Sequence, residues 1–207
     1  SKQKGRDFGI ILACLADEGY SVEWRVVNSA DYGSAQRRRR TFIFAYRNTT
    51  SYGTHKKDVP ADTILHTGFM AQAFPIREMD TIKNTILPDD ITDISDTFQF
   101  DFQSAGYMTG HHVYTASIIP NAEEPVTLGD VLIHCQDESY YISGDSLQRW
   151  CYYKSAKKIS RTAADGHSYI FSEGAIPFPD PWDRPSRTLL TSGERMGRTA
   201  HIVADPG

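Results

Sequence analysis

The sequence predicts an α+β fold, in which a helix and an antiparallel strand pair precede a mixed α/β region. Four apolar residues recur at the i, i+3, i+4, i+7 spacing of one helical face: Phe8, Ile11, Leu12 and Leu15. Residues 21–27 alternate polar with apolar side chains, and residues 41–46 form an apolar run of strand formers. A polar stretch over residues 48–57 then marks a linker. We therefore expect one domain over residues 1–47 and a second over residues 48–207.

The first domain is predicted to hold a helix over about residues 7–18, because Gly19 stands where a C-terminal cap belongs. The loop between its two strands ends in Gln36 and four consecutive arginines. In the second domain we predict a short helix near residues 77–86, strands at 112–119, 126–135 and 139–142, a helix or turn at 145–152, and a Gly/Pro-rich passage at 174–185.

The composition fits a folded protein that needs neither a metal nor disulfides. Aromatic residues make up 12% and charged residues 23% of the 207 positions. No apolar run approaches the ~20 residues of a membrane span, and the N-terminus lacks a signal-peptide stretch, so we expect a cytoplasmic location. The three cysteines form no C-x-x-C pair, and no histidine cluster has zinc spacing. We therefore predict no metal site.

The formal charge of −4 hides an uneven distribution. Residues 1–47 carry nine Lys/Arg against five Asp/Glu, residues 48–148 carry four against fifteen, and residues 149–207 carry nine against six. A nucleic-acid duplex is attracted to local basic patches and not to the average charge. The two basic ends are therefore candidate contact surfaces.

The four arginines, Arg37, Arg38, Arg39 and Arg40, come just before the second strand, so we expect their guanidinium groups to project from a strand terminus. The fixed fork of donors suits phosphate oxygens and the carbonyl edge of a base. A solvated basic turn or a targeting signal has the same composition, and the segment by itself leaves both alternatives open.

A second basic segment, residues 149–161, holds five basic residues, no acidic residue and three aromatics. This mixture suits contact with a DNA backbone, although an ordinary basic surface is the alternative. The candidate contacts are Lys154, Lys157, Lys158 and Arg161. Residues 184–192 are dense in arginines and hydroxyls, and they offer Arg187 and Thr188 as further donors to phosphate.

Three blocks of the chain, in a fixed order, resemble the DNA cytosine-5 methyltransferase family. Residues 5–20 are similar to the seventh conserved block, a helix that ends in Gly-Tyr. Residues 24–45 match the eighth block, with Asp-Tyr-Gly and a Q-x-R-x-R signature at Gln36, Arg38 and Arg40, although Ala35 replaces the usual proline. Residues 173–203 resemble the ninth block, except that Ser-Gly-Glu at 192–194 departs from the usual Ser-Glu order.

The resemblance implies that the chain is a C-terminal fragment of such an enzyme. Residues 1–47 would be the end of a Rossmann-like methyltransferase domain, and residues 48–207 a target-recognition domain that binds double-stranded DNA. In this family S-adenosylmethionine methylates C5 of a flipped cytosine after a cysteine thiolate adds to C6. The sequence holds no G-x-G-x-x-G loop and no Pro-Cys pair. We therefore expect the chain alone to be inactive, to bind no cofactor, and to need an N-terminal catalytic segment.

The same resemblance assigns roles to the arginines of the signature. Arg40 would donate to cytosine O2 and support charge during attack, and Arg38 would hold the base or a nearby phosphate, with Gln36 as a structural part of the motif. Further DNA contacts are expected from Arg37, Arg39 and Arg198.

A strand pair without its sheet neighbours would leave an uncovered edge over residues 41–46, so we expect self-association there. Two alternatives stay open. Instead of a fragment of the enzyme, the chain could be a non-catalytic specificity subunit completed by another chain, or a globular domain with no nucleic-acid role.

Overall fold

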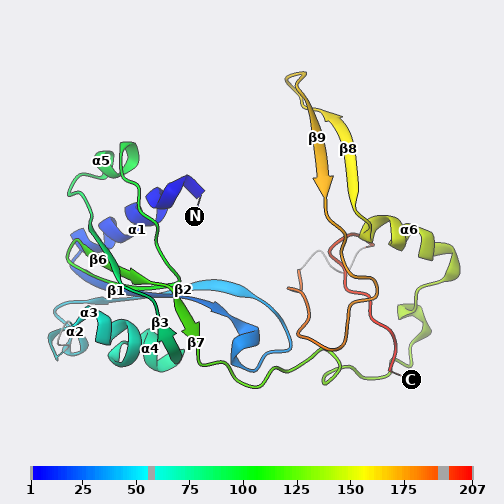
Figure 1. The fold of residues 1–207 in the computed structure, drawn as a ribbon, viewed down its shortest axis with the longest axis horizontal. Coiled ribbons are helices and arrows are strands. Elements are labelled where there is room, and N and C mark those ends of the chain that lie inside the picture. Colours follow the sequence, from blue (N-terminus) through cyan, green and yellow to red (C-terminus); the bar gives the residue numbers. More distant parts are fainter. Residues whose placement is uncertain (1, 56–58, 191–195, 207) are drawn as a thin grey trace. The chain divides into compact units, whose positions relative to one another are not determined.

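The computed structural model of the chain describes residues 2–55, 59–190 and 196–206. The chain forms two compact units (Figure 1). The first unit contains residues 1–32 and 39–124, and the second contains residues 33–38 and 125–207. The compact units therefore do not divide at residue 48, because strands beyond the predicted linker complete a sheet begun before it. The functional division into residues 1–47 and 48–207 stays a prediction.

The first unit is a mixed α/β structure around one antiparallel sheet. Its elements are η1 (Lys2–Gly5), α1 (Arg6–Asp17), β1 (Tyr20–Asn28), η2 (Ser29–Tyr32), β2 (Arg39–Arg47), α2 (Ser51–His55), α3 (Pro60–Asp62), η3 (Thr63–Thr67), α4 (Phe69–Ala73), β3 (Ile76–Met79), β4 (Lys83–Ile86), α5 (Ile91–Asp96), β5 (Ala105–Thr109), β6 (His112–Ala116) and β7 (Ile118–Pro120). The five-stranded sheet has the order β2-β1-β5-β6-β4, and β3 pairs with β7.

The helix and strand pair predicted at the N-terminus are confirmed. Gly19 has a φ of 76°, the left-handed conformation that glycine adopts without steric cost, and it lets the chain leave α1 and enter β1. β1 pairs with β2 along its full length, from Tyr20 opposite Arg47 to Asn28 opposite Arg39. However, β1 also pairs with β5, so within the described strands only β2 and β4 lie at the sheet edges.

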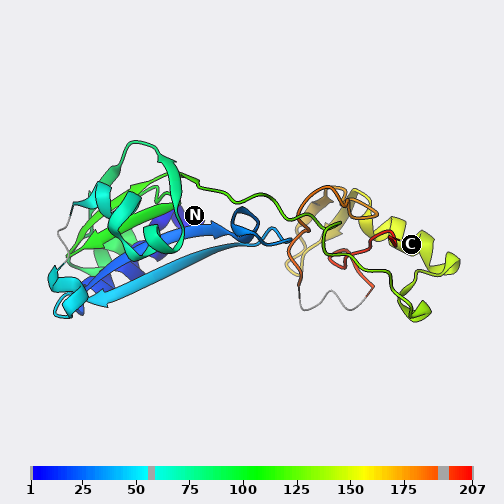
Figure 2. The same ribbon diagram turned by 90° about the horizontal axis from the view of Figure 1, so that it is seen from below.

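Both faces of β1 are buried, although its alternating pattern is typical of a strand with one face in solvent. Leu12 and Ala13 of α1 pack in one core cluster with Val22 and Trp24. On the opposite face, helices η3 and α4 cover the polar side chains of β1, and Figure 2 shows these helices in front of the sheet. The sheet is therefore the middle layer of the unit.

Two buried charged residues of β1 hold those helices through hydrogen bonds. Glu23 is 2% exposed, and its carboxylate accepts from the backbone N–H of Met70 at 3.0 Å in the first turn of α4. Arg25 is 1% exposed and donates to the carbonyls of Ile64, at 2.6 Å, and Phe74. These side chains satisfy backbone groups at helix ends that have no partner within their own helix. Burial lowers the pKa of Arg25, against the opposing effect of Tyr32 and Glu23.

The close packing of the sheet gives a prediction for Gly106 in β5. A Cβ atom at this position would overlap the indole of Trp24, which packs edge-to-face against Phe8 at 5.3 Å. Gly106→Ala is therefore expected to lower the free energy of unfolding by about 2 kcal/mol, measured by urea unfolding followed by circular dichroism. Gly144→Ala is the control, because nothing lies within 4 Å of the added methyl. Equal midpoints for the two variants would contradict this packing.

The second unit contains η4 (Glu138–Tyr140), α6 (Gly144–Lys154), β8 (Lys157–Thr162) and β9 (Ser168–Glu173). The predicted helix at 145–152 is confirmed as α6. The predicted strand at 126–135 is wrong, because Asp130 accepts from the backbone and hydroxyl of Thr127, both at 2.8 Å, and closes a turn. The strand predicted at 139–142 is also wrong. Asp137 accepts from the N–H of Ser139 at 2.9 Å and caps the N-terminus of η4.

The helix predicted near residues 77–86 is wrong as well, because β3 and β4 occupy this segment and pair with β7 and β6. The strand predicted at 112–119 is confirmed in part, because the segment divides at Ser117 into β6 and β7, which belong to different sheets. The predicted linker contains α2, and its residues 56–58 lie outside the described residues.

Within the described ranges, no helix is long and apolar enough to cross a membrane. The same ranges hold no group of three or more His, Cys, Asp or Glu residues placed to bind a metal ion.

Candidate nucleic-acid interface

The loop with the glutamine-arginine signature is joined by backbone hydrogen bonds to a segment far along the chain, within the second unit. Gln36 forms a parallel bridge with Ser186. The N–H of Ser186 donates to the carbonyl of Ala35 at 2.7 Å, and the N–H of Arg37 donates back to the carbonyl of Ser186 at 2.9 Å. Two segments that resemble different conserved blocks therefore lie side by side.

Residues 188 and 189 extend this contact. The hydroxyl of Thr188 donates to the carbonyl of Arg37 at 2.6 Å, so Thr188 positions the loop. Arg38 is exposed, and its Nη1 lies 3.5 Å from the carbonyl of Leu189, at the limit of hydrogen bonding. The Arg37 side chain is exposed too. Backbone bonds thus fix the loop while leaving both guanidinium groups accessible.

Arg39 and Arg40 begin β2 in the first unit and point to opposite faces of the sheet, because side chains alternate along a strand. Arg40 lies opposite Val27 and shares its face with Arg25, whereas Arg39 lies opposite Asn28. Both arginines are exposed, and Nη1 of Arg40 donates to the carbonyl of Arg39 at 2.7 Å.

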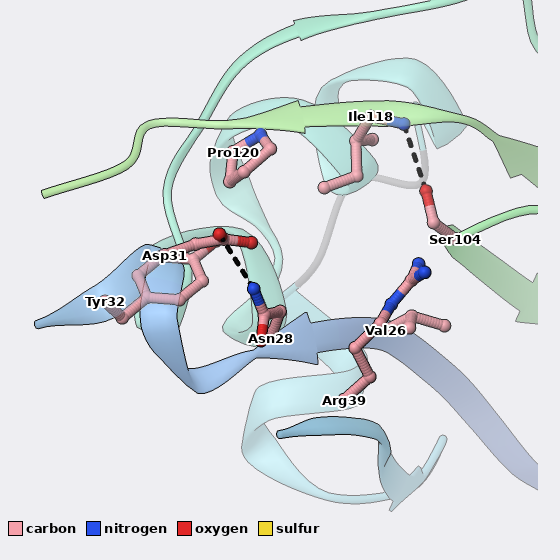
Figure 3. Close-up of a pocket in the computed structure, with 8 residues that line it drawn as sticks. All are labelled: Val26, Asn28, Asp31, Tyr32, Arg39, Ser104, Ile118 and Pro120. Atoms are coloured by element: carbon pink, nitrogen blue, oxygen red, sulfur yellow. Dashed lines mark hydrogen bonds between the residues drawn. The ribbon is translucent and has the colours of Figure 1, made fainter. Parts of the chain in front are cut away.

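A cavity of about 220 Å³ lies beside Arg39 (Figure 3). It is lined by Val26, Asn28, Asp31, Tyr32, Arg39, Ser104, Ile118 and Pro120. The amide of Asn28 donates to Asp31 at 3.0 Å, and the hydroxyl of Ser104 accepts from the N–H of Ile118 at 3.0 Å. These polar groups therefore already form hydrogen bonds within the protein. Neither signature arginine, Arg38 or Arg40, lines this cavity.

The basic segment predicted at residues 149–161 spans the end of α6 and strand β8. Nζ of Lys157 lies 4.0 Å from the centre of the Tyr152 ring, and Cζ of Arg161 lies 3.9 Å from the centre of the Phe171 ring. Such contacts hold a cation in place without neutralising it. Lys158 and Arg161 are exposed and Lys157 is half-buried, so their charges remain available to an anion.

Lys154 does not fit its predicted role as a DNA contact. It is 2% exposed, and its ammonium donates to the carbonyl of Arg198 at 3.1 Å and to that of Ala200. Burial is the main cause that lowers its pKa. The lysine joins α6 to the C-terminal segment, and a buried ammonium with these partners cannot reach a phosphate.

Arg187 and Arg198 are also structural in this arrangement. Arg187 forms a two-point ion pair with the buried Asp180, at 2.7 and 3.0 Å. Arg198 donates to the carbonyls of Tyr153 at 3.3 Å and Gly174, and it faces Glu173 at 3.7 Å. Both side chains are half-buried and have internal partners, and their contacts with phosphate stay predictions.

Sequence reasoning missed three features of the described structure. The partnership of Ser186 with the signature loop left no local signal, because it joins residues about 150 positions apart. Asp180 is flanked by prolines and reads as an ordinary loop residue. The hydroxyl residues of β9 lie outside the predicted basic segment. The signal that could have found them is that the backbone N–H and C=O groups of β8 need a partner strand.

Comparisons with known proteins agree on one family. Residues 1–169 match the sequence model of the family described as C-5 cytosine-specific DNA methylase. The Type II methyltransferase M.Sau3AI of Staphylococcus aureus is 42% identical to the chain over 207 residues, which cover 98% of the chain and 50% of that protein. The chain thus spans about half the length of this curated relative. No solved structure matches it.

Proposed function

The chain belongs to the C-5 cytosine-specific DNA methylases, and from this premise we propose that it is the part of such an enzyme that binds duplex DNA and recognises the target sequence. The intact enzyme would act in the bacterial or phage-infected cytoplasm and transfer a methyl group to C5 of a cytosine flipped out of the duplex. Flipping is needed because C5 and C6 are enclosed by the stacked bases.

One observation carries this proposal. Within the described residues, Arg37, Arg38, Arg39 and Arg40 are all exposed, and no carboxylate pairs with any of them. Four adjacent positive charges repel each other, and an accumulation of this kind is stabilised by a polyanion. The backbone bonds to residues 186–188 hold the start of this run in one conformation, which reduces the entropy lost on binding.

The signature arginines are assigned separate roles. Arg40 donates to O2 of the flipped cytosine and supports the negative charge that develops as a thiolate adds to C6. Arg38 holds the base or the adjacent phosphate. Arg37 and Arg39, together with Lys157, Lys158 and Arg161, contact the DNA backbone and position the duplex.

The methyl donor of this family is S-adenosylmethionine, but the residues of this chain do not fit a site for it. Within the described ranges, no strand runs through a glycine-rich loop into a helix: β2 leads to α2 through Asn48, Thr49 and Thr50, and β4 leads to α5 through residues 87–90. We therefore assign no step of methyl transfer to this chain. An N-terminal catalytic segment would supply the cofactor site and the thiolate, with the uncovered edge of β2 open to that segment or to a second copy.

Duplex binding across a salt series tests this function. The logarithm of the affinity for a short mixed-sequence duplex is expected to fall linearly with log salt between about 50 and 200 mM, and Arg37→Ala to reduce the slope by about 0.9, the value for one phosphate contact. Fluorescence anisotropy with a labelled duplex measures both.

The matched control is Arg77→Ala, because Arg77 is also exposed but pairs with Glu78 at 3.1 Å outside the proposed interface. This variant should keep the wild-type slope. Salt-independent binding by the wild-type chain, or an equal change in both variants, would count against the proposal.

A further inference from the structure

The β8–β9 hairpin is a two-stranded antiparallel ribbon of six residue pairs, from Lys157 opposite Glu173 to Thr162 opposite Ser168. It stands out from α6 and the rest of the second unit in Figure 1. Residues directly opposite each other share a face, and successive residues alternate between faces. The ribbon therefore has two distinct surfaces.

The two surfaces differ in composition. The packed face consists of Lys157, Ile159, Arg161, Tyr169, Phe171 and Glu173. The hydroxyl face consists of Lys158, Ser160, Thr162, Ser168, Ile170 and Ser172. Four members of the packed face are half-buried, whereas all six members of the hydroxyl face are exposed.

The hydroxyl face has no partner among the described residues. None of its four hydroxyls forms a hydrogen bond within the described chain, and Ile170 is 71% exposed at its centre. A large apolar side chain on an open strand is a liability unless another molecule covers it. The hairpin holds three basic residues and two acidic residues; of the acids, Asp165 lies in the turn, and Glu173 faces Arg198 at 3.7 Å. An anionic partner is therefore favoured.

We propose that the hydroxyl face of the β8–β9 ribbon enters the major groove of DNA and reads base edges. This inference rests on the proposed function and assigns its sequence selectivity to named residues. Ser160, Thr162, Ser168 and Ser172 donate to or accept from base edges, Ile170 contacts a thymine methyl group, and Lys158 donates to a guanine edge or a flanking phosphate.

The geometry favours base edges over the phosphate backbone. The major groove, roughly 12 Å wide, admits a two-stranded ribbon, and each base pair presents a distinct pattern of donors, acceptors and methyl groups there. Serine and threonine side chains are short, so they reach bases only from a ribbon that lies inside the groove. A surface built for phosphates alone would carry more lysine and arginine and would have no use for an exposed isoleucine.

Selection from a duplex pool with a randomised central window tests the inference on the full chain. The first variant combines Ser160→Ala, Thr162→Ala, Ser168→Ala and Ser172→Ala. The second places valine at the same four positions, which keeps strand preference while removing the hydroxyls. A control combines Thr49→Ala, Thr67→Ala and Thr81→Ala, three exposed hydroxyls of the first unit.

Sequencing of the bound duplexes is expected to show that wild type and control enrich the same motif. Both hydroxyl-face variants should lose at least about tenfold of that enrichment, as expected from lost base contacts. Their affinity for the unselected pool should stay within about twofold, because the phosphate contacts remain.

Three results would overturn the inference. If both variants keep the wild-type motif and enrichment, the ribbon does not read bases, while the proposed function stands. If the wild-type chain binds no duplex in the pool, the proposed function fails and the inference fails with it. If light scattering shows a wild-type dimer that both variants abolish while selection is unchanged, the face belongs to a second copy of the chain.

Discussion

Arg40→Ala is expected to lower the single-turnover rate of cytosine methylation by roughly 10²–10³-fold, the usual effect of removing one donor to a developing charge. The assay combines the chain with the catalytic segment that we propose completes it, S-adenosylmethionine and duplex DNA. The physical reason is that Arg40 carries an exposed guanidinium with no carboxylate partner in the described chain. Its charge is therefore free to stabilise negative charge on cytosine O2.

Two variants separate this role from general attraction to DNA. Arg37→Ala should weaken duplex binding without changing the rate of the bound complex, because Arg37 is proposed to contact phosphate only. Arg40→Lys should recover part of the rate, since lysine keeps the charge but loses the planar fork of donors. The chain alone is expected to give no methylation. Methylation by the chain alone would overturn its proposed dependence on a catalytic segment, and a wild-type rate for Arg40→Ala would overturn its role.

Local sequence patterns were sufficient for the first 47 residues. The apolar spacing of α1, Gly19 and the two strand-forming runs each depend on neighbours within about ten residues. The helix predicted at 77–86 is wrong because the structure of this segment depends on distant residues. β3 and β4 form because β7 and β6 arrive from later in the chain to pair with them, and local composition does not carry that information.

The candidate site was predicted only in part, because some of its contacts join segments that are far apart in the sequence. The glutamine-arginine signature is contiguous and was found directly. Its backbone partner Ser186 was inside a recognised block, but adjacency between the two blocks is a property of the fold. The role predicted for Lys154 is wrong because composition shows that a residue is charged but not whether its side chain is buried. Only the structure places its ammonium under the carbonyls of Arg198 and Ala200.

The buried charge cluster of the second unit gives the largest stability effect that we expect. Asp180→Asn should lower the free energy of unfolding of this unit at neutral pH by roughly 3 kcal/mol, the lower end for a buried pair, because it leaves the half-buried Arg187 and the buried Lys154 without their counterion. Asp180 is 3% exposed and holds Arg187 at two points, and it also accepts from the N–H of Ile202 at 3.1 Å. Asp183→Asn is the control. Asp183 forms an ion pair of the same length, 2.7 Å, with Arg184, but both groups are exposed, so the unfolding midpoint should hardly move.

The pH dependence identifies the carboxylate as the cause. Burial raises the pKa of Asp180, but hydrogen bonds from Arg187 and Ile202 outweigh it and the pKa is lowered overall. The stabilisation is therefore complete above the unfolded pKa of about 3.9 and is lost as the pH falls through the lower folded value. Burial, with Arg187, also lowers the pKa of His201, so the second unit should begin to lose stability as the pH falls below about 6.5 in both wild type and Asp180→Asn. Urea unfolding measured across this pH range checks this, and the difference in midpoint between wild type and Asp180→Asn should disappear only below about pH 4. A difference that disappears near neutral pH would assign the effect to His201 instead.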